Sequence, residues 1–257
     1  MATTVRVRAN ALALFLAIAV VAAAATACES GPARAQHISA GCPGGGRVAL
    51  TFDDGPNPPF TDSVLDLLTG AHVTATFFVE GEAAEANPAA VKREATLGMA
   101  VGSHSFSHAD DLASSSQSTI AGDTARADDA LAAALGYRPS VYRAPYGRTS
   151  PAMLSVLRSA GYTSIGWDVD SADWSDADVD AIVSNVVDHV HPGAIILMHD
   201  GGLGGGNPDR SRTLSALPRI IEGLRARGYT FATVPELIGV LPARIPGTHR
   251  EATCSAS

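Results

Sequence analysis

Short apolar runs alternate with helix-like stretches along most of the chain. Each run is bounded by turn-forming residues, a pattern that predicts buried strands rather than helices. The predicted strands cover residues 48–52, 74–79, 99–103, 141–143, 164–168, 194–199 and 230–234. Because helical patterns separate the strands, the chain is expected to form βαβ units with a parallel sheet.

The helical stretches carry recognisable start and stop signals. Asn87-Pro88 and Ser150-Pro151 each place a capping residue before a proline, which suits the first helical position. Ser175 to Asp178 resemble a capping box in front of a further helix. Helix-like segments are followed by glycines where a left-handed C-cap is expected. These glycines are Gly136, Gly161 and Gly228.

About seven βα units in roughly 200 residues favour a closed or partly closed sheet. We therefore predict an α/β fold: a distorted or partly open (β/α) barrel of about seven parallel strands. An open doubly wound sheet is the alternative. In both architectures ligands bind beyond the carboxyl ends of the strands, so residues that perform chemistry are expected there.

The N-terminus has the features of an export signal. Arg6 and Arg8 precede an apolar run over residues 11–25, and Ala25-Thr26-Ala27 suits cleavage by a signal peptidase. We predict a signal peptide over residues 1–27 and a secreted or cell-envelope protein. The residues before Cys28 also resemble a bacterial lipoprotein signal, so a lipid anchor through Cys28 and plain secretion both remain open. A linker is predicted over 28–46, a folded domain over 47–242 and a tail over 243–257.

The net charge and the cysteines bear on the binding partners and on possible disulfides. The 257 residues carry a formal net charge of -8, which argues against nucleic acid as a partner because such proteins present a basic face. We expect a monomer. Cys42 and Cys254 flank the domain, and export permits a disulfide between them. Two unpaired thiols in the chain ends are the alternative, because sequence does not give their separation.

Two adjacent carboxylates, Asp53 and Asp54, follow the first apolar run and precede Gly55-Pro56. Two charges at the end of a buried strand are costly unless a metal, a positive partner or unequal pKa values accommodate them. An Asp-rich turn is the alternative. Because neighbours on a strand point to opposite faces, the two carboxylates are expected to serve different partners.

A histidine pair, His104 and His108, follows the run at 99–103. Two histidines at this spacing can converge on one ion from a helical face or from a compact turn. Together with a carboxylate from another strand, they would form a His₂Asp site with open positions for water. The pair alone is a weak signal, and a carboxylate at a neighbouring strand end strengthens it.

Arg143 ends another short strand and precedes Pro145 and Tyr146. Arginine is suited to holding a carboxylate through two hydrogen bonds. Proline fixes the turn behind it. A surface arginine followed by a packing tyrosine is the alternative reading of the same residues.

The last two clusters combine acids, aromatics and histidine. Asp170, Asp173 and Trp174 follow one strand, and carboxylates beside aromatic rings suit a sugar-binding cleft. A solvated acidic loop is the alternative. His199 ends a strongly apolar strand, which makes it a candidate for proton transfer. A hydrogen-bonded core histidine is the ordinary alternative.

Together the clusters resemble the NodB-type polysaccharide deacetylases, carbohydrate esterase family 4. The five motifs of that family occur here in order as Thr51-Phe52-Asp53-Asp54, His104-Ser105-x-x-His108, Arg143-x-Pro145-Tyr146, Asp170-x-x-Asp173-Trp174 and Leu197-x-His199. The resemblance runs from about residue 48 to 241 and makes 47–242 a polysaccharide deacetylase catalytic domain, or NodB homology domain. Ala144 stands where several members carry proline and leaves the motif intact.

The resemblance implies metal-assisted removal of acetyl groups from sugars. Asp54, His104 and His108 would hold a divalent ion, with Zn²⁺ expected first and Co²⁺ or another divalent ion left open. Asp53 would be the general base, and Arg143 would hold and orient it.

The resemblance also implies that the backbone N–H of Tyr146 would donate a hydrogen bond to the oxyanion of the tetrahedral intermediate. His199 would protonate the leaving amine, and Asp173 would raise its pKa, with Asp170 as the alternative acid in that role. The substrate-binding groove would be formed by Tyr146, Pro145, Trp174 and Leu197.

The expected substrate is an acetylated glycan. We predict an exported de-N-acetylase acting on peptidoglycan or chitin-like N-acetylglucosamine glycans. An O-acetyl esterase acting on acetylated xylan is the alternative, because the motifs are shared across these substrates. A non-catalytic glycan-binding protein would need a broken catalytic position, and none is seen.

Overall fold

A computed structural model describes residues 1, 37–42, 44–202 and 209–244. The predicted signal peptide, Cys28 and most of the predicted tail, including Cys254, lie outside these residues. Residues 35–257 form one compact unit, and the fold below concerns that unit. Among the described helices, none combines the length and the apolar character needed to cross a membrane.

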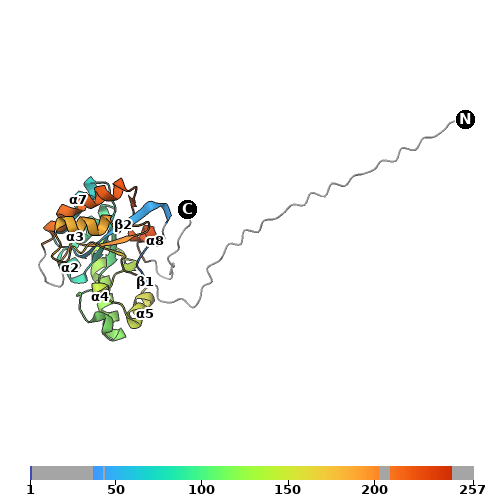
Figure 1. The fold of residues 1–257 in the computed structure, drawn as a ribbon. Helices are drawn as coiled ribbons and strands as arrows, with labels where there is room; N and C mark the ends of the chain where they lie inside the picture. The colour runs from blue at the N-terminus through green and yellow to red at the C-terminus, as the bar shows by residue number, and fades with distance from the viewer. Residues whose placement is uncertain (2–36, 43, 203–208, 245–257) are drawn as a thin grey trace. The chain divides into compact units, whose positions relative to one another are not determined.

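The described residues contain one nine-stranded sheet (Figure 1). Its strands are β1 His37–Ile38, β2 Arg47–Gly55, β3 Thr76–Val79, β4 Ala100–Ser103, β5 Val141–Tyr142, β6 Thr163–Ile165, β7 Val169–Asp170, β8 Ile195–His199 and β9 Thr230–Phe231. Every strand predicted from an apolar run forms. The sequence analysis missed β1, which lies in the stretch assigned to a linker, and β7, which lies in the polar cluster around Asp170.

The sheet is parallel and strongly curled. Its strands follow the order β1-β6-β5-β4-β3-β2-β8-β7, with β9 paired to β2. β6 and β7 stand six positions apart in this order, which in a flat sheet means about 29 Å. Only residues 166–168 join these two strands, and that connection can span at most about 14 Å. A flat sheet is therefore excluded.

Contacts across the gap show where the sheet curls back on itself. The Asp168 N–H donates to the Ile195 carbonyl at 3.2 Å, and Ala40 forms an isolated bridge with Ala194. These contacts bring the β1–β6 edge to the start of β8. The predicted α/β fold, a distorted and partly open barrel, is confirmed, and the open doubly wound alternative is wrong.

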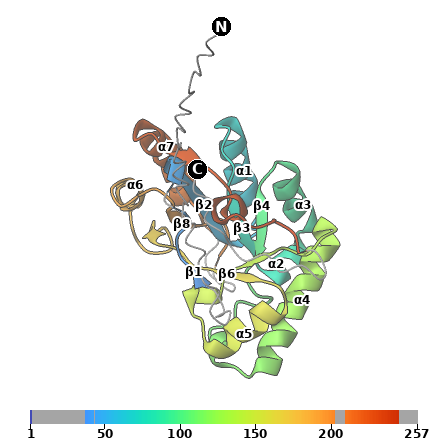
Figure 2. The same ribbon diagram turned by 90° about the vertical axis from the view of Figure 1, so that its right-hand side faces the viewer.

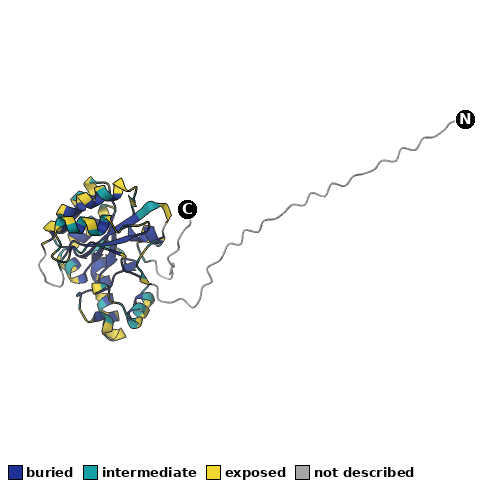
Figure 3. Cartoon of the chain, in the orientation of Figure 1, coloured by how far each residue is buried: buried dark blue, intermediate teal, exposed yellow. Residues whose placement is uncertain are grey.

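Helices surround the sheet, as Figure 2 shows. They are α1 Phe60–Gly70, α2 Gly81–Ala86, α3 Pro88–Thr96, α4 Gln117–Leu135, α5 Pro151–Ser159, α6 Val179–Val187, α7 Ser211–Ala226 and α8 Val234–Ile238, with 3₁₀ turns at Gly44–Gly46, Leu112–Ser114 and Pro145–Gly147. Apart from β1 and β9, the strands are almost wholly buried, and many exposed residues lie on the helices (Figure 3). Burial on both faces explains why the strands show continuous apolar runs.

The helix caps confirm one prediction and correct another. Ser150 caps α5, its hydroxyl accepting the Met153 N–H at 3.1 Å. The predicted capping box at Ser175 is wrong. Asp178 caps α6 by accepting the Ala181 N–H at 2.8 Å, whereas the Ser175 hydroxyl belongs to the turn before it. An aspartate directly before the helix competes successfully for the free N–H groups.

Part of the predicted linker belongs to the sheet edge. Residues 37–38 form β1 and pair with β6, inside the stretch 28–46 assigned to a linker. Cys42 is buried and disulfide-bonded. Because Cys254 lies outside the described residues, the pairing of Cys42 with Cys254 stays a prediction.

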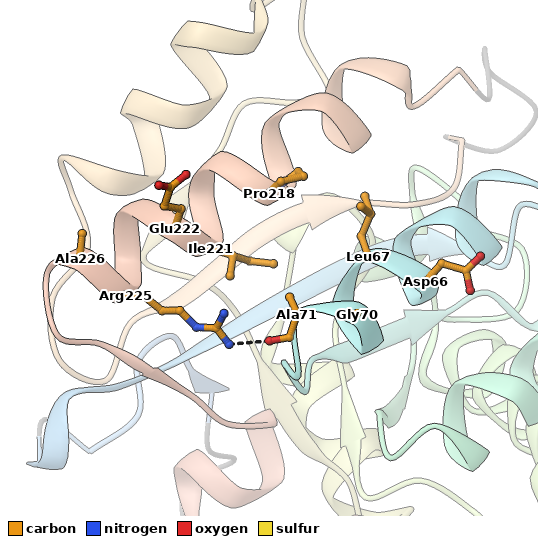
Figure 4. A pocket seen from close by; sticks show the side chains of 9 residues that line it. All are labelled: Asp66, Leu67, Gly70, Ala71, Pro218, Ile221, Glu222, Arg225 and Ala226. Carbon is orange, nitrogen blue, oxygen red and sulfur yellow. Dashed lines mark hydrogen bonds between the residues drawn. The ribbon is translucent and has the colours of Figure 1, made fainter.

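A cavity of about 720 Å³ lies between α1 and α7, away from the strand ends (Figure 4). Pro218 and Ile221 line it from α7, and the Arg225 guanidinium donates to the Ala71 carbonyl at 2.6 Å. None of the predicted site residues lines this cavity. The chemistry must therefore be sought at the carboxyl ends of the strands.

Ser150 and Asn87 each precede a proline at the start of a helix, but their side chains should contribute differently to the free energy of unfolding. Ser150→Ala removes the cap bond of α5 and should lower the free energy of unfolding by about 1 kcal/mol. Asn87 makes no side-chain cap bond to α3, so Asn87→Ala should change it by less than about 0.5 kcal/mol. Urea unfolding followed by circular dichroism measures both. Equal losses would contradict the assigned caps.

Candidate active site

Neighbouring strand ends bring the predicted site residues together. Asp53 is in register with His199 across β2 and β8, and Ser103, one residue before His104, is in register with Tyr142, one residue before Arg143. The four side chains therefore stand at the same level of the curled sheet. This confirms that the polar clusters gather at the carboxyl edge.

The end of β2 departs from a regular strand. Asp54 has a left-handed backbone, φ 70°, and the register with β3 shifts between Asp53 and Gly55. Both carboxylates consequently approach one ring: His104 Nε2 lies 3.2 Å from Asp54 Oδ1 and 3.9 Å from Asp53 Oδ2. The expectation that the two aspartates point to opposite faces is wrong, because a bulge replaces the regular pleat.

Asp54, His104 and His108 form a compact three-residue group. Asp54 Oδ1 lies 3.2 Å from His104 Nε2 and 3.4 Å from His108 Nε2, and one ligand atom from each residue lies within 4.8 Å of the others. The group is buried. No other such group occurs within the described ranges.

The surroundings of the group suit a divalent cation. His104 Nδ1 donates to the Arg143 carbonyl at 2.8 Å, which orients the ring so that Nε2 faces Asp54. Asp54 Oδ2 is buried without a hydrogen-bond partner. Two imidazole nitrogens and one carboxylate are a ligand set typical of zinc sites with open positions. The residues present therefore fit the metal.

The buried carboxylates and imidazoles of the group shift one another's pKa values in the metal-free protein. Burial opposes ionisation of Asp54, but the His104 hydrogen bond and charge outweigh it and lower its pKa. Burial likewise disfavours charged His104, yet Asp53 and Asp54 raise its pKa. Burial and the nearby His104 lower the pKa of His108 to about 4, which leaves that imidazole neutral.

Asp53 is held from the side opposite to the histidines. Arg143, fully buried, donates from Nη1 to Asp53 Oδ1 and to Thr51 Oγ1, both at 2.7 Å. Its Nη2 donates to the Gly166 carbonyl at 2.9 Å, so Asp53 receives one hydrogen bond rather than the two predicted. The ring of Phe78 lies 4.1 Å below the guanidinium. The other oxygen, Asp53 Oδ2, lies 3.9 Å from His104 Nε2.

His199 and Asp173 form a second pair. His199 Nδ1 donates to Asp173 Oδ1 at 2.7 Å, and Asp173 Oδ2 accepts the His199 backbone N–H at 2.9 Å and the Thr213 hydroxyl at 2.8 Å. Burial alone would lower the pKa of His199, but the Asp173 carboxylate outweighs it and raises the pKa to about 9. Asp170 accepts hydrogen bonds from Trp174 and Ala172 instead.

Comparisons with known proteins agree with this geometry. The model of the family described as "Polysaccharide deacetylase" matches residues 40–165. A chitooligosaccharide deacetylase of Sinorhizobium fredii is 39% identical over 199 residues, covering 74% of this chain and 90% of that protein. A peptidoglycan-N-acetylglucosamine deacetylase of Bacillus cereus is 36% identical over 198 residues, covering 74% and 87%.

A solved structure is similar over an even larger share of the chain. The crystal structure of a peptidoglycan N-acetylglucosamine deacetylase aligns with a TM-score of 0.75 at 35% identity, covering 81% of this chain and 95% of that chain. The chain belongs to the polysaccharide deacetylase family. The resemblance to carbohydrate esterase family 4 is thereby confirmed.

Two of the predicted groove residues have exposed aromatic side chains. Tyr146 and Trp174 are 43% and 53% exposed, and the Tyr146 ring packs edge-on against His108 with 4.6 Å between centroids. The other predicted groove residues, Leu197 and Pro145, are buried. Tyr146 and Trp174 are therefore accessible to a ligand, whereas Leu197 and Pro145 are shielded from solvent.

The sequence did not reveal two buried threonines that hold carboxylates of the candidate site and its surroundings. Thr213 on α7 holds Asp173, and Thr61 on α1 donates to Asp200 at 2.5 Å. Both threonines are buried in helices. Nothing in their local sequence distinguishes them from core threonines, and only the packing of distant helices against the strand ends reveals them.

The assigned partner of His199 can be tested by titration. In the metal-free protein, His199 should titrate with a pKa of about 9. Asp173→Asn removes the neighbouring negative charge, so the pKa should fall to the ordinary value of about 6.5 or lower. NMR of the ring nitrogens measures it. Thr213→Val, which removes only a hydroxyl, should shift the pKa less, and an unchanged pKa in Asp173→Asn would contradict the pairing.

Proposed function

We propose that the protein is an exported, metal-dependent hydrolase that removes N-acetyl groups from peptidoglycan or chitin-like N-acetylglucosamine glycans. The observation that carries the proposal is the convergence of Asp54, His104 and His108 beside a separately held Asp53. The two relatives above, which are named for chitooligosaccharide and peptidoglycan deacetylation, support the substrate class. The N-terminal sequence supports export, with or without a lipid on Cys28, and we propose that the enzyme acts as a monomer.

Asp54, His104 and His108 would hold the divalent ion, with Zn²⁺ preferred because imidazole and carboxylate ligands with open positions suit it. An ion held there supplies Lewis-acid activation of water and of the acetyl carbonyl. His104 is kept in a ligand-ready orientation by its bond to the Arg143 carbonyl. The same arginine thus orients a histidine through its backbone and an aspartate through its side chain.

Asp53 acts as the general base. Arg143 occupies Oδ1, so the carboxylate cannot rotate freely, and Oδ2 remains directed towards the site. Oδ2 accepts the proton of the water that attacks the acetyl carbonyl. Because Arg143 is fully buried and bonded to Thr51 as well, it holds this orientation without swinging into solvent.

His199 acts as the general acid. Its Nδ1 is engaged by Asp173, which leaves Nε2 to donate a proton to the departing amine. Against the effect of burial, the Asp173 carboxylate raises the pKa of His199, to about 9 in the metal-free protein, and so favours the protonated imidazole that an acid requires. An amide substrate needs this acid because an amine departs poorly without a proton.

The exposed aromatics position the glycan. Trp174 offers its ring to the apolar face of a pyranose, with its indole N–H donating to Asp170 at 3.2 Å. Tyr146 has a left-handed backbone, φ 57°, within the 3₁₀ turn after β5. Its backbone N–H would meet the oxyanion of the tetrahedral intermediate.

Each role predicts a distinct loss. Asp53→Asn should keep the metal and lower turnover by about 10²–10⁴-fold, because it removes only the base. His104→Ala should lose both metal and turnover. Metal analysis and acetate release measure the two effects, with exposed Asp66→Asn as a control expected to behave as wild type. Wild-type turnover in Asp53→Asn would show that the base is assigned wrongly.

Substrate and metal dependence can be tested together. Acetate release should be highest on peptidoglycan or chitooligosaccharides, should vanish after chelation and should return with Zn²⁺. Release from acetylated xylan alone would identify an O-acetyl esterase instead. Activity that persists in protein shown by elemental analysis to be metal-free would overturn the metal-dependent mechanism.

A further inference from the structure

The left-handed conformation of Asp54 needs support from its surroundings. A residue with a side chain rarely adopts φ 70°, and such a strained conformation persists only where the surrounding structure enforces it. If Asp54 returned to a regular strand conformation, its side chain would turn to the other face of β2. Its carboxylate would then leave His104 and His108. Whatever holds this backbone therefore holds the metal site together.

The residues that follow β8 lie directly against this backbone. The N–H groups of Asp200 and Gly201 both donate to the Asp53 carbonyl, each at 3.2 Å. A Cβ atom at Gly201 would lie only 1.8 Å from the Asp54 carbonyl oxygen. Glycine is thus the residue that allows this close approach. The two backbones are locked together over the bulge.

The Asp200 side chain holds the other side of the bulge. It is fully buried, and a Cβ atom at Gly55 would lie 2.3 Å from its Oδ2. Oδ2 accepts the Thr61 hydroxyl at 2.5 Å, and the Thr61 oxygen accepts the Asn57 N–H at 2.7 Å. The carboxylate is therefore fixed between α1 and the residue that follows Asp54.

A buried arginine completes the arrangement. Arg210, the residue before α7, donates from Nε to the Gly201 carbonyl. We call Thr61, Asp200, Gly201 and Arg210 the Asp54 clamp. None of these hydrogen bonds joins a clamp residue to a side-chain atom of Asp54, His104 or His108. The clamp would therefore act on the metal site through the backbone.

We propose that the Asp54 clamp is a positioning device that sets the metal affinity of the site by enforcing the left-handed conformation of Asp54. The inference rests on the proposed role of Asp54 as a metal ligand. Asp53 has its own anchor in Arg143, so loss of the clamp affects Asp54 first. In this way α1 and the segment after β8 would affect the metal site although they supply none of its three ligands.

The test removes the hydroxyl that holds Asp200. Thr61→Val should raise the zinc dissociation constant about 10–100-fold, the usual effect of losing a group that orients a ligand. Turnover measured at saturating zinc should fall less than the affinity does. Thr61→Ser, which keeps the hydroxyl, should restore the affinity. Thr61→Ala repeats the test in case the second methyl group of valine prevents folding.

Thr124→Val is the matched control. Thr124 is also a buried helical threonine, and its hydroxyl donates to the Ile120 carbonyl within α4 at 2.8 Å. This variant should lose stability without a change in zinc affinity. If Thr61→Val lowers the melting temperature but leaves the zinc dissociation constant unchanged, Thr61 is merely structural and the proposal is overturned.

A second readout needs neither metal nor catalysis. In the metal-free protein, the amides of Asp200 and Gly201 should exchange hydrogen about tenfold faster or more in Thr61→Val than in Thr124→Val, because a bond to a buried carboxylate is lost. Unchanged exchange would overturn the clamp. If the wild type bound no zinc while the exchange rates changed as expected, the proposed function would fail and the clamp would stand as a purely structural support.

Discussion

A single left-handed residue at the end of β2 allows two neighbouring carboxylates to face one site. In a regular strand, Asp53 and Asp54 would point to opposite faces of the sheet. The bulge turns Asp54 back, so that both carboxylates lie within 4 Å of the same His104 nitrogen. Two buried negative charges this close repel, and the arrangement persists only because each has a different positive or hydrogen-bonding partner. This constraint explains why Asp53 and Asp54 have different partners.

The curled sheet supplies those partners. Because the strands are parallel, their carboxyl ends meet at one edge, and the register of β4 with β5 brings His104 next to Arg143. Arg143 is wholly buried, and leaving such a charge unpaired costs about 3–5 kcal/mol. Asp53 and Arg143 therefore need each other. On the other side of β2, β8 delivers His199, whose own carboxylate, Asp173, keeps it charged.

The sequence predicted more of the site's membership than of its geometry. Apolar runs located the strands because burial on both faces leaves a continuous pattern, and polar residues after them marked the edge. β1 and β7 were missed because no apolar run marks them: β1 lies in a Gly- and Pro-rich stretch and β7 among polar residues. The bulge at Asp54 could not be predicted, since the residues that enforce it, Thr61 and Asp200, lie far apart in the chain. The single bond from Arg143 to Asp53 likewise depends on Gly166, a competing acceptor that only the fold brings near.

Asp53 and Asp54 are adjacent but are expected to differ in their effect on zinc binding, and zinc titration tests this difference most directly. Metal-free wild type, Asp53→Asn and Asp54→Asn would be titrated with Zn²⁺ against a chromophoric chelator, with folding checked by circular dichroism. If Asp54 is the ligand and Asp53 the base, Asp54→Asn loses most of the zinc affinity while Asp53→Asn stays close to wild type. Equal losses in the two variants, or a larger loss in Asp53→Asn, would contradict the account.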